Sequence, residues 1–74
     1  MRRQLVAYSG DEKLACSIPF SEDRIPLLRH LFNTEDDEQM VLVYHVAPEM
    51  RDKISRILAR DLDPSLDYFI ETFS

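Results

Sequence analysis

The chain has 74 residues, of which 45% are hydrophobic and 31% are charged, a composition that fits a single folded domain over residues 1–74 and argues against a disordered chain. Its 14 acidic and 9 basic side chains give a net charge of −5, which is the wrong sign for nonspecific nucleic-acid binding and favours a basic partner. The single glycine argues against a glycine-rich phosphate loop, and the single cysteine excludes an internal disulfide or a zinc site built from several cysteines.

The first predicted element is a β-hairpin between residues 3 and 18. Residues 3–8 form a β-prone run, residues 9–13 are typical of a turn in which Gly10 is able to take a positive φ, and residues 14–18 alternate like a half-buried strand. This alternation puts Leu14, Cys16 and Ile18 on one side. We therefore expect Cys16 to be a small buried residue and Pro19 to end the strand.

Two amphipathic helices are predicted, over residues 24–32 and 48–60. Either Ser21 or Asp23 is able to cap the first, and a cap at Asp23 would place Pro26 in the first turn, where its missing N–H removes no hydrogen bond. Pro48 suits the first position of the second helix. The apolar stripes at helical spacing are Ile25, Leu28, Leu31 and Phe32 in the first helix, and Ala47, Met50, Ile54, Ile57 and Leu58 in the second.

Between these helices, the sequence predicts an exposed acidic loop over residues 34–39 and a central strand over residues 40–46, where nearly every position is apolar. The acidic run lacks the glycine and the ligand spacing of a calcium loop, so we expect a solvated loop and no metal site.

The last predicted elements are a turn at residues 63–65 and a strand over residues 67–73. In this strand Tyr68, Ile70 and Thr72 share one side, and Phe69, Glu71 and Phe73 share the other. The element order is therefore β-β-α-β-α-β. It predicts an α+β domain with one mainly antiparallel four-stranded sheet and two helices packed on one face, the other face being open to solvent or to a partner.

No pattern of catalytic residues accompanies this fold. His30, beside Arg29, and His45, in a strand, are each in a setting where histidine far more often has a structural or surface role. No Ser or Cys lies in a recognisable nucleophile motif. We expect no enzyme and no cofactor. The first ten residues hold two arginines but no long apolar run, which predicts neither a signal peptide nor a membrane span and favours a cytoplasmic protein.

The final strand is the best candidate for an interface. Glu71 between Phe69 and Phe73 combines charge with aromatic area, and at protein interfaces aromatic residues supply binding energy while carboxylates steer and specify. In the alternative interpretation, all the aromatic residues enter the core, the acids keep a sheet edge soluble, and the net charge serves solubility alone.

The hairpin, the two helices, the short strand near Tyr44 and above all the closing DLDPSLDYFIETF, with Asp67-Tyr68-Phe69 leading into the last strand, carry a family resemblance. In its order of elements nearly the whole chain resembles the small acidic immunity proteins that neutralise bacterial toxins, in particular the cloacin and ribosome-cleaving colicin immunity type. It also looks like a group of short uncharacterised bacterial proteins with a similar tail. The chain departs from the pattern in lacking tryptophan and in its short hairpin turn.

The resemblance implies a cytoplasmic protein that binds the basic C-terminal nuclease domain of a cognate toxin and neutralises it by occlusion. We expect a monomer or weak homodimer when free, with no direct binding to nucleic acid or membrane. Two alternatives stay open: a structural or regulatory module that dimerises or acts as an adaptor, and a phage-type acidic inhibitor of nucleic-acid enzymes. The residues expected to contact the partner are Glu35, Asp36, Asp37, Glu38, Asp67, Glu71, Tyr8 and Tyr44.

Overall fold

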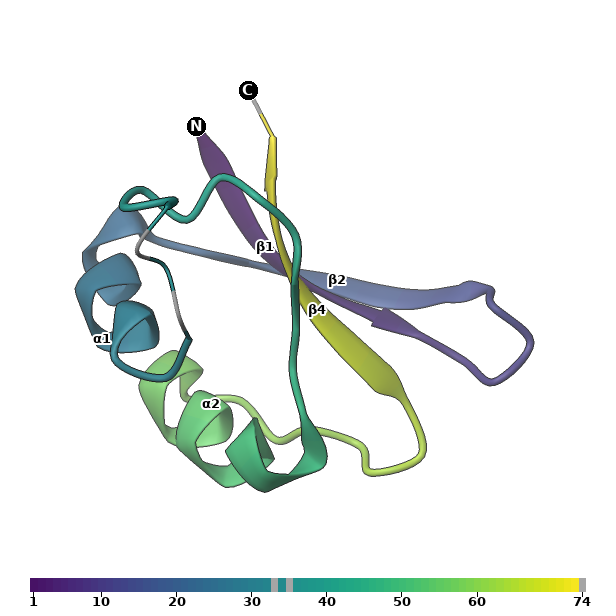
Figure 1. The fold of residues 1–74 in the computed structure, drawn as a ribbon. Coiled ribbons are helices and arrows are strands. Elements are labelled where there is room, and N and C mark those ends of the chain that lie inside the picture. Colours follow the sequence, from purple (N-terminus) through teal and green to yellow (C-terminus); the bar gives the residue numbers. More distant parts are fainter. Residues whose placement is uncertain (33, 35, 74) are drawn as a thin grey trace.

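The computed structural model describes residues 1–32, 34 and 36–73, and over these residues the chain forms one four-stranded sheet and two α-helices (Figure 1). The spatial order of the strands is β2-β1-β4-β3, and every neighbouring pair is antiparallel. The predicted α+β fold and its element order are confirmed. The strands are β1 (Arg2–Tyr8), β2 (Leu14–Phe20), β3 (Tyr44–His45) and β4 (Asp67–Phe73).

Each α-helix continues a short 3₁₀ helix. Helix η1 (Glu22–Arg24) leads into α1 (Ile25–Arg29), and η2 (Pro48–Met50) leads into α2 (Arg51–Leu58). Pro26 and Pro48 both lie in first turns, as predicted, and the two α-helices lie together on one side of the sheet (Figure 1).

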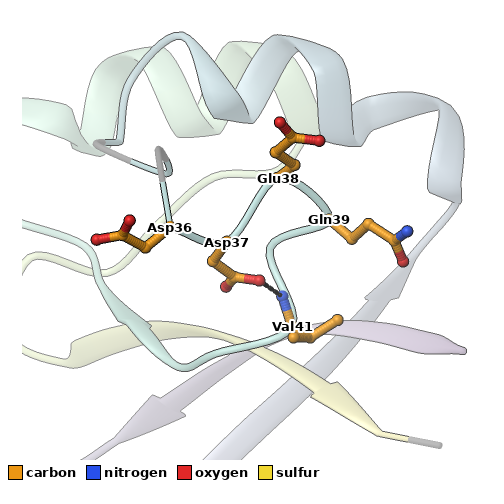
Figure 2. A pocket seen from close by; sticks show the side chains of 5 residues that line it. All are labelled: Asp36, Asp37, Glu38, Gln39 and Val41. Atoms are coloured by element: carbon orange, nitrogen blue, oxygen red, sulfur yellow. Dashed lines mark hydrogen bonds between the residues drawn. The ribbon is translucent and has the colours of Figure 1, made fainter.

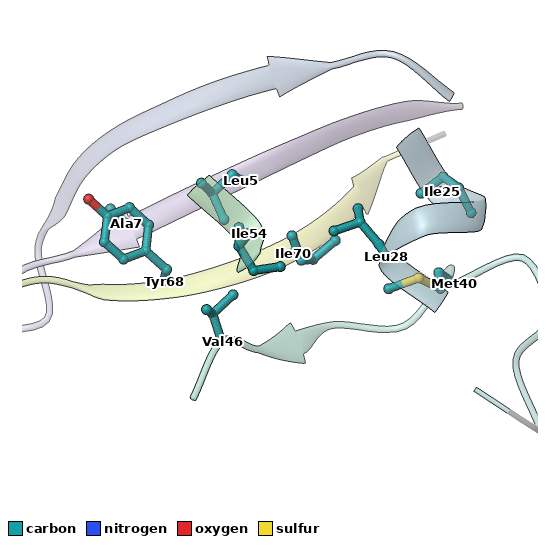
Figure 3. Packing of buried hydrophobic residues seen from close by; sticks show 9 residues of the cluster. All are labelled: Leu5, Ala7, Ile25, Leu28, Met40, Val46, Ile54, Tyr68 and Ile70. Atoms are coloured by element: carbon teal, nitrogen blue, oxygen red, sulfur yellow. The ribbon is translucent and has the colours of Figure 1, made fainter. Parts of the chain in front are cut away.

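The hydrophobic core lies between this pair of helices and the sheet. In Figure 3 the side chains of Leu5 and Ile70, from adjacent central strands, point toward Ile54 of α2 and Leu28 of α1. All four are fully buried, so each contributes about 1.5–3 kcal/mol by leaving water. The buried core cluster consists of Leu5, Ala7, Ile25, Leu28, Met40, Val46, Ile54, Tyr68 and Ile70.

The first hairpin differs from its prediction in several details. β2 does not end at Pro19, which pairs with Gln4, because β2 is an edge strand where a proline can direct its missing N–H outward. The register shifts between Ala7 and Tyr8. Because of this bulge, Leu14 joins the face of Tyr8 instead of the face of Cys16, and Leu14 is 60% exposed.

Two further predictions for the hairpin are wrong. Cys16 is exposed, since it lies on the edge strand and no residue of β2 belongs to the buried cluster. Gly10 has no positive φ; Glu12 takes the left-handed conformation in this turn, at φ 64°.

Residues 40–46 do not form the central strand that their composition predicts. Only Tyr44–His45 pair with the sheet, and they do so at its edge. Met40 has a φ of 50°, which interrupts any extended run, and Leu42 and Val43 are 60% and 62% exposed. The apolar composition here reflects two buried anchors, Met40 and Val46, on either side of an exposed segment.

Both helices are shorter than predicted. α1 ends at Arg29, after which the Leu31 N–H bonds to the Leu28 carbonyl in a tighter three-residue turn. α2 ends at Leu58 because Ala59 takes a left-handed conformation, and the Arg60 N–H then bonds back to the Ser55 carbonyl at 3.0 Å.

Candidate interaction surface

The face of the sheet opposite the helices is the first part of the candidate surface. Period-two alternation and the β1–β4 register put Tyr8 beside Asp67 and Gln4 beside Glu71 on this side. His45 of β3 is paired with Phe69 of β4, so His45 lies on the same side of the sheet as these residues. We call this side the open face and define it by Tyr8, His45, Asp67, Phe69 and Glu71. The predicted alternation of the last strand is confirmed.

A short row of aromatic rings crosses the open face from β1 to β3. The rings of Tyr8 and Phe69 meet edge to face, with centroids 5.7 Å apart and planes at 77°. On the other side of Phe69, the His45 ring lies 5.1 Å away at a tilt of 50°. Aromatic pairs prefer edge-to-face or offset arrangements, so these contacts favour a defined arrangement of the row, in which the Tyr8 and Phe69 rings are partly exposed.

Glu71 connects this row to negative charge. The Tyr8 hydroxyl donates a hydrogen bond to Glu71 Oε2 at 3.2 Å. Burial raises the pKa of the Tyr8 phenol above its ordinary value of 10.0, and the Glu71 carboxylate raises it further through its charge and the hydrogen bond. Tyr8 therefore remains a neutral hydrogen-bond donor at physiological pH. Both Tyr8 and Glu71, which the sequence analysis named as expected contact residues, lie on the open face.

A hollow of about 400 Å³ lies at the hairpin end of the open face. It is lined by Tyr8, Phe69 and Asp67 from the strands, and by Ser9, Gly10 and Glu12 from the turn. We call it the hairpin pocket. Glu12 was not among the predicted contact residues. It lines the pocket in a turn where it takes a positive φ, a conformation that the sequence pattern suggested for Gly10.

The acidic loop, the second part of the predicted site, is divided in the structure. Asp36 and Glu38 are exposed, whereas Asp37 is only 8% exposed. Figure 2 shows the Asp37 side chain directed at Val41, with those of Asp36 and Glu38 pointing elsewhere. The three acids line a shallow hollow of about 410 Å³ together with Gln39 and Val41. Glu35 lies outside the described residues.

Asp37 organises the chain that follows it. Its carboxylate accepts hydrogen bonds from the Val41 N–H at 3.0 Å, the Leu42 N–H at 2.8 Å and the Tyr44 hydroxyl at 2.7 Å. The Val41 N–H is the largest of the influences that hold the pKa of this carboxyl below 3.8. The prediction that Asp37 is an exposed acid is wrong, because its oxygens satisfy backbone donors that would otherwise need a strand neighbour.

Tyr44 belongs to the same arrangement. Its pairing with Ile70 puts it on the helix side of the sheet, where its ring lies 5.3 Å from that of Phe32. Burial raises the pKa of Tyr44 to about 12, and the hydrogen bond and charge of Asp37 contribute to this rise. Tyr44, which the sequence offered as a partner contact, is therefore half-buried on the helix side of the sheet and is not part of the open face.

Arg3 binds this loop to the sheet. The sequence pattern did not indicate this role for Arg3. The side chain is buried and donates to the Met40 carbonyl at 2.6 Å, to Thr72 Oγ1 at 2.9 Å and to Glu22 Oε1 at 2.9 Å. Because Thr72 lies on the helix side of β4 and itself donates to Met40, the loop is held on that side and not over the open face. The predicted contact acids thus fall into two separate groups.

The turn before β4 also has a structural role. The Asp63 carboxylate accepts the Ser65 N–H at 2.8 Å, while the Asp63 N–H donates to the hydroxyl of the buried Tyr68 at 2.7 Å. Arg51 of α2 donates to the carbonyls of Pro64 and Leu66. The closing segment of the chain therefore contributes Asp67, Phe69 and Glu71 to the open face, and Tyr68 to the core.

Two absences concern the part of the chain that the structure describes. None of its helices has both the length and the hydrophobicity that a membrane-spanning helix requires. Its His, Cys, Asp and Glu side chains do not form a group of three or more that is arranged to hold a metal ion.

Comparison with known protein families gives a match over most of the chain. A family model described as "Domain of unknown function (DUF7683)" matches residues 2–71. The matched range contains all the open-face residues defined above. No curated protein and no solved structure matches the chain.

Proposed function

The chain belongs to the DUF7683 family, and we propose that it is an immunity protein, which binds the nuclease domain of a cognate bacterial toxin and neutralises it without chemistry of its own. The observation that carries this proposal is the open face, where a row of aromatic rings lies between carboxylates and no helix of the described part of the chain covers it. Aromatic anchors beside charged groups are the usual composition of a specific protein interface.

The charge of the chain supports a basic partner. A net charge of −5 attracts a protein that is itself positive because it binds nucleic acid. Asp67 and Glu71 lie within the aromatic surface, where carboxylates select cationic partners and disfavour acidic ones. A nuclease domain combines a positive surface with a site that an inhibitor is able to occlude.

The proposal assigns no catalytic role to either histidine. His30 follows α1 and is exposed, while His45 is exposed on the open face against Phe69. The expected location is the cytoplasm of the producing bacterium, where an immunity protein meets its toxin before secretion.

A second candidate function has an observation in its favour. β2 is an edge strand whose outer side has no strand partner within the described chain, and Leu14 on it is 60% exposed. Pairing of this edge with a second copy would make the protein a structural or regulatory homodimer. Sedimentation equilibrium separates the two functions, because a stable dimer supports the module and a monomer supports the inhibitor.

Deletion of the gene tests the proposal directly. With the neighbouring genes left intact, loss of the inhibitor should release the toxin and arrest growth, and a plasmid copy of the chain should restore growth. As a control, the same deletion in a strain whose adjacent toxin gene is inactivated should grow normally. Healthy growth of the deletion strain in the presence of an active neighbouring toxin would overturn the proposal.

A further inference from the structure

The hairpin pocket has a fixed shape because the turn above it is tied by its own backbone. The Ser9 N–H donates to the Lys13 carbonyl at 2.9 Å, and the Glu12 N–H donates to the Ser9 carbonyl at 2.9 Å. The Ser9 hydroxyl also donates to Asp11. Together with the left-handed conformation of Glu12, these bonds fold the turn over the end of the open face, so the pocket is present before any partner arrives.

The walls of the pocket are aromatic. Tyr8 and Phe69 line it, and their edge-to-face contact at 5.7 Å holds both rings. The hydrogen bond from the Tyr8 hydroxyl to Glu71 also restrains the position of the hydroxyl end of that side chain. A ring with a fixed, partly exposed π-face attracts a cation electrostatically.

The charged groups of the pocket are all negative. Glu12 and Asp67 are exposed and line it, and no Lys, Arg or His is among the lining residues that the structure describes. Lys13 is adjacent in sequence, but its amine lies 3.7 Å from Asp11, outside the lining. An anionic occupant would be repelled here, and an apolar one would strip water from two carboxylates without replacing its hydrogen bonds.

We propose that the hairpin pocket receives an arginine side chain of the basic protein partner. A guanidinium is planar, so it stacks on the face of one of the two rings, whose planes are 77° apart, while its N–H groups point at Glu12 and Asp67. Lysine fits less well, because its compact ammonium is more strongly hydrated and lacks the flat surface. This inference rests on the proposed function for the identity of the partner, and it adds the residue on which recognition depends.

A titration monitored by nuclear magnetic resonance tests the pocket without knowledge of the partner. The probes are N-acetyl-arginine amide and its neutral citrulline counterpart. The backbone amide of Gly10 is a convenient reporter, since it is the only glycine of the chain and lines the pocket. The arginine probe should shift this resonance saturably and the citrulline probe should not.

Two double variants, each of which removes two negative charges, test the role of the pocket acids. Glu12→Gln with Asp67→Asn should weaken arginine binding about tenfold, since charge-assisted hydrogen bonds are lost. Asp36→Asn with Glu38→Gln removes two exposed acids outside the pocket and should change the affinity less than about twofold. Equal response to citrulline, or equal weakening by both double variants, would overturn the pocket assignment.

Complementation of the deletion strain distinguishes failure of the pocket from failure of the proposed function. A pocket variant that protects as fully as the unmodified chain would refute the arginine contact and leave the immunity role standing. Growth of the deletion strain beside an active toxin would refute the immunity role, whereas saturable arginine binding would still support the pocket. Loss of protection in the pocket variant alone is the expected result.

Discussion

Asp37 holds the segment that leads into β3 through three hydrogen bonds to one carboxylate. Both backbone donors come from the part of the chain that passes the edge of the sheet without pairing to it. Because these bonds favour the ionised carboxylate, its pKa is lower in the folded chain than in the unfolded one. The charge at this position therefore serves the fold, while the exposed Asp36 and Glu38 remain free to act on a partner.

Replacement of Asp37 by Asn should lower the midpoint of thermal unfolding by roughly 5 °C near neutral pH. The amide has one oxygen and one NH₂ group, so one of the N–H donors now bonded would face another donor. The folded pKa of Asp37 is depressed, so its stabilisation is present above the unfolded value of about 3.8 and is lost as pH falls through the folded value. The difference between the two proteins should consequently shrink below pH 4.

Thermal melts followed by circular dichroism from pH 2.5 to 7 would measure this difference. Asp36→Asn is the matched control, because Asp36 is adjacent and exposed and should change the midpoint little. If Asp37→Asn were as harmless as its neighbour at pH 7, the carboxylate would not be organising the loop.

At the level of the elements, the sequence predicted best where alternation is long and uninterrupted. β4 is the clearest case: Tyr68 and Ile70 face the core while Phe69 and Glu71 face outward, as their spacing indicates. Prediction failed where a side chain or a turn competes with the regular pattern. The carboxylate of Asp37 captures the donors of a would-be strand, and nothing in a run of neighbouring acids indicates which one turns inward.

A one-residue bulge likewise limited what could be predicted of the hairpin end of the candidate site. The shift between Ala7 and Tyr8 moves Leu14 to the other face, and hairpin registers of this kind depend on turn geometry that local composition does not specify. The open face could thus be predicted along β4, but the pocket at its hairpin end could not.

The end of α2 provides a test of element energetics. Ala59 takes φ 54° and ψ 46° at the point where the helix ends, a conformation that is unfavourable for every residue with a Cβ and is usually occupied by glycine. Ala59→Gly should therefore stabilise the fold by about 1 kcal/mol, although glycine is the poorer helix former. Urea unfolding at 25 °C would measure the change.

Ala47→Gly is the control for this substitution. Ala47 precedes η2 in an ordinary extended conformation, at φ −65° and ψ 152°, so glycine there adds only chain entropy to the unfolded state and should destabilise. Opposite signs for the two Ala→Gly changes are expected. Destabilisation by both would show that the left-handed conformation at residue 59 carries no strain.

For the whole molecule, the distribution of charge matters more than its total. The chain measures 31 × 25 × 20 Å, which is several times the screening length of about 8 Å at physiological salt. The acids of the hairpin pocket and those of the loop lie at different parts of the sheet. Glu12 and Asp67 lie near Tyr8, whereas the loop is held near Thr72. A partner bound on the open face would contact the first group and experience the second only through the long-range field.

These two groups should therefore affect different rates of binding to the toxin domain that the deletion test identifies. Asp36→Asn with Glu38→Gln should slow association about two- to threefold at low salt, because it weakens attraction during diffusion, and should leave dissociation unchanged. Glu12→Gln with Asp67→Asn should mainly speed dissociation, since it removes contacts in the bound state. Stopped-flow mixing at about 20 mM and about 500 mM salt separates the effects. An association rate of the unmodified chain that does not respond to salt would rule out steering, and a loop variant that dissociates faster would place the loop inside the interface instead of beside it.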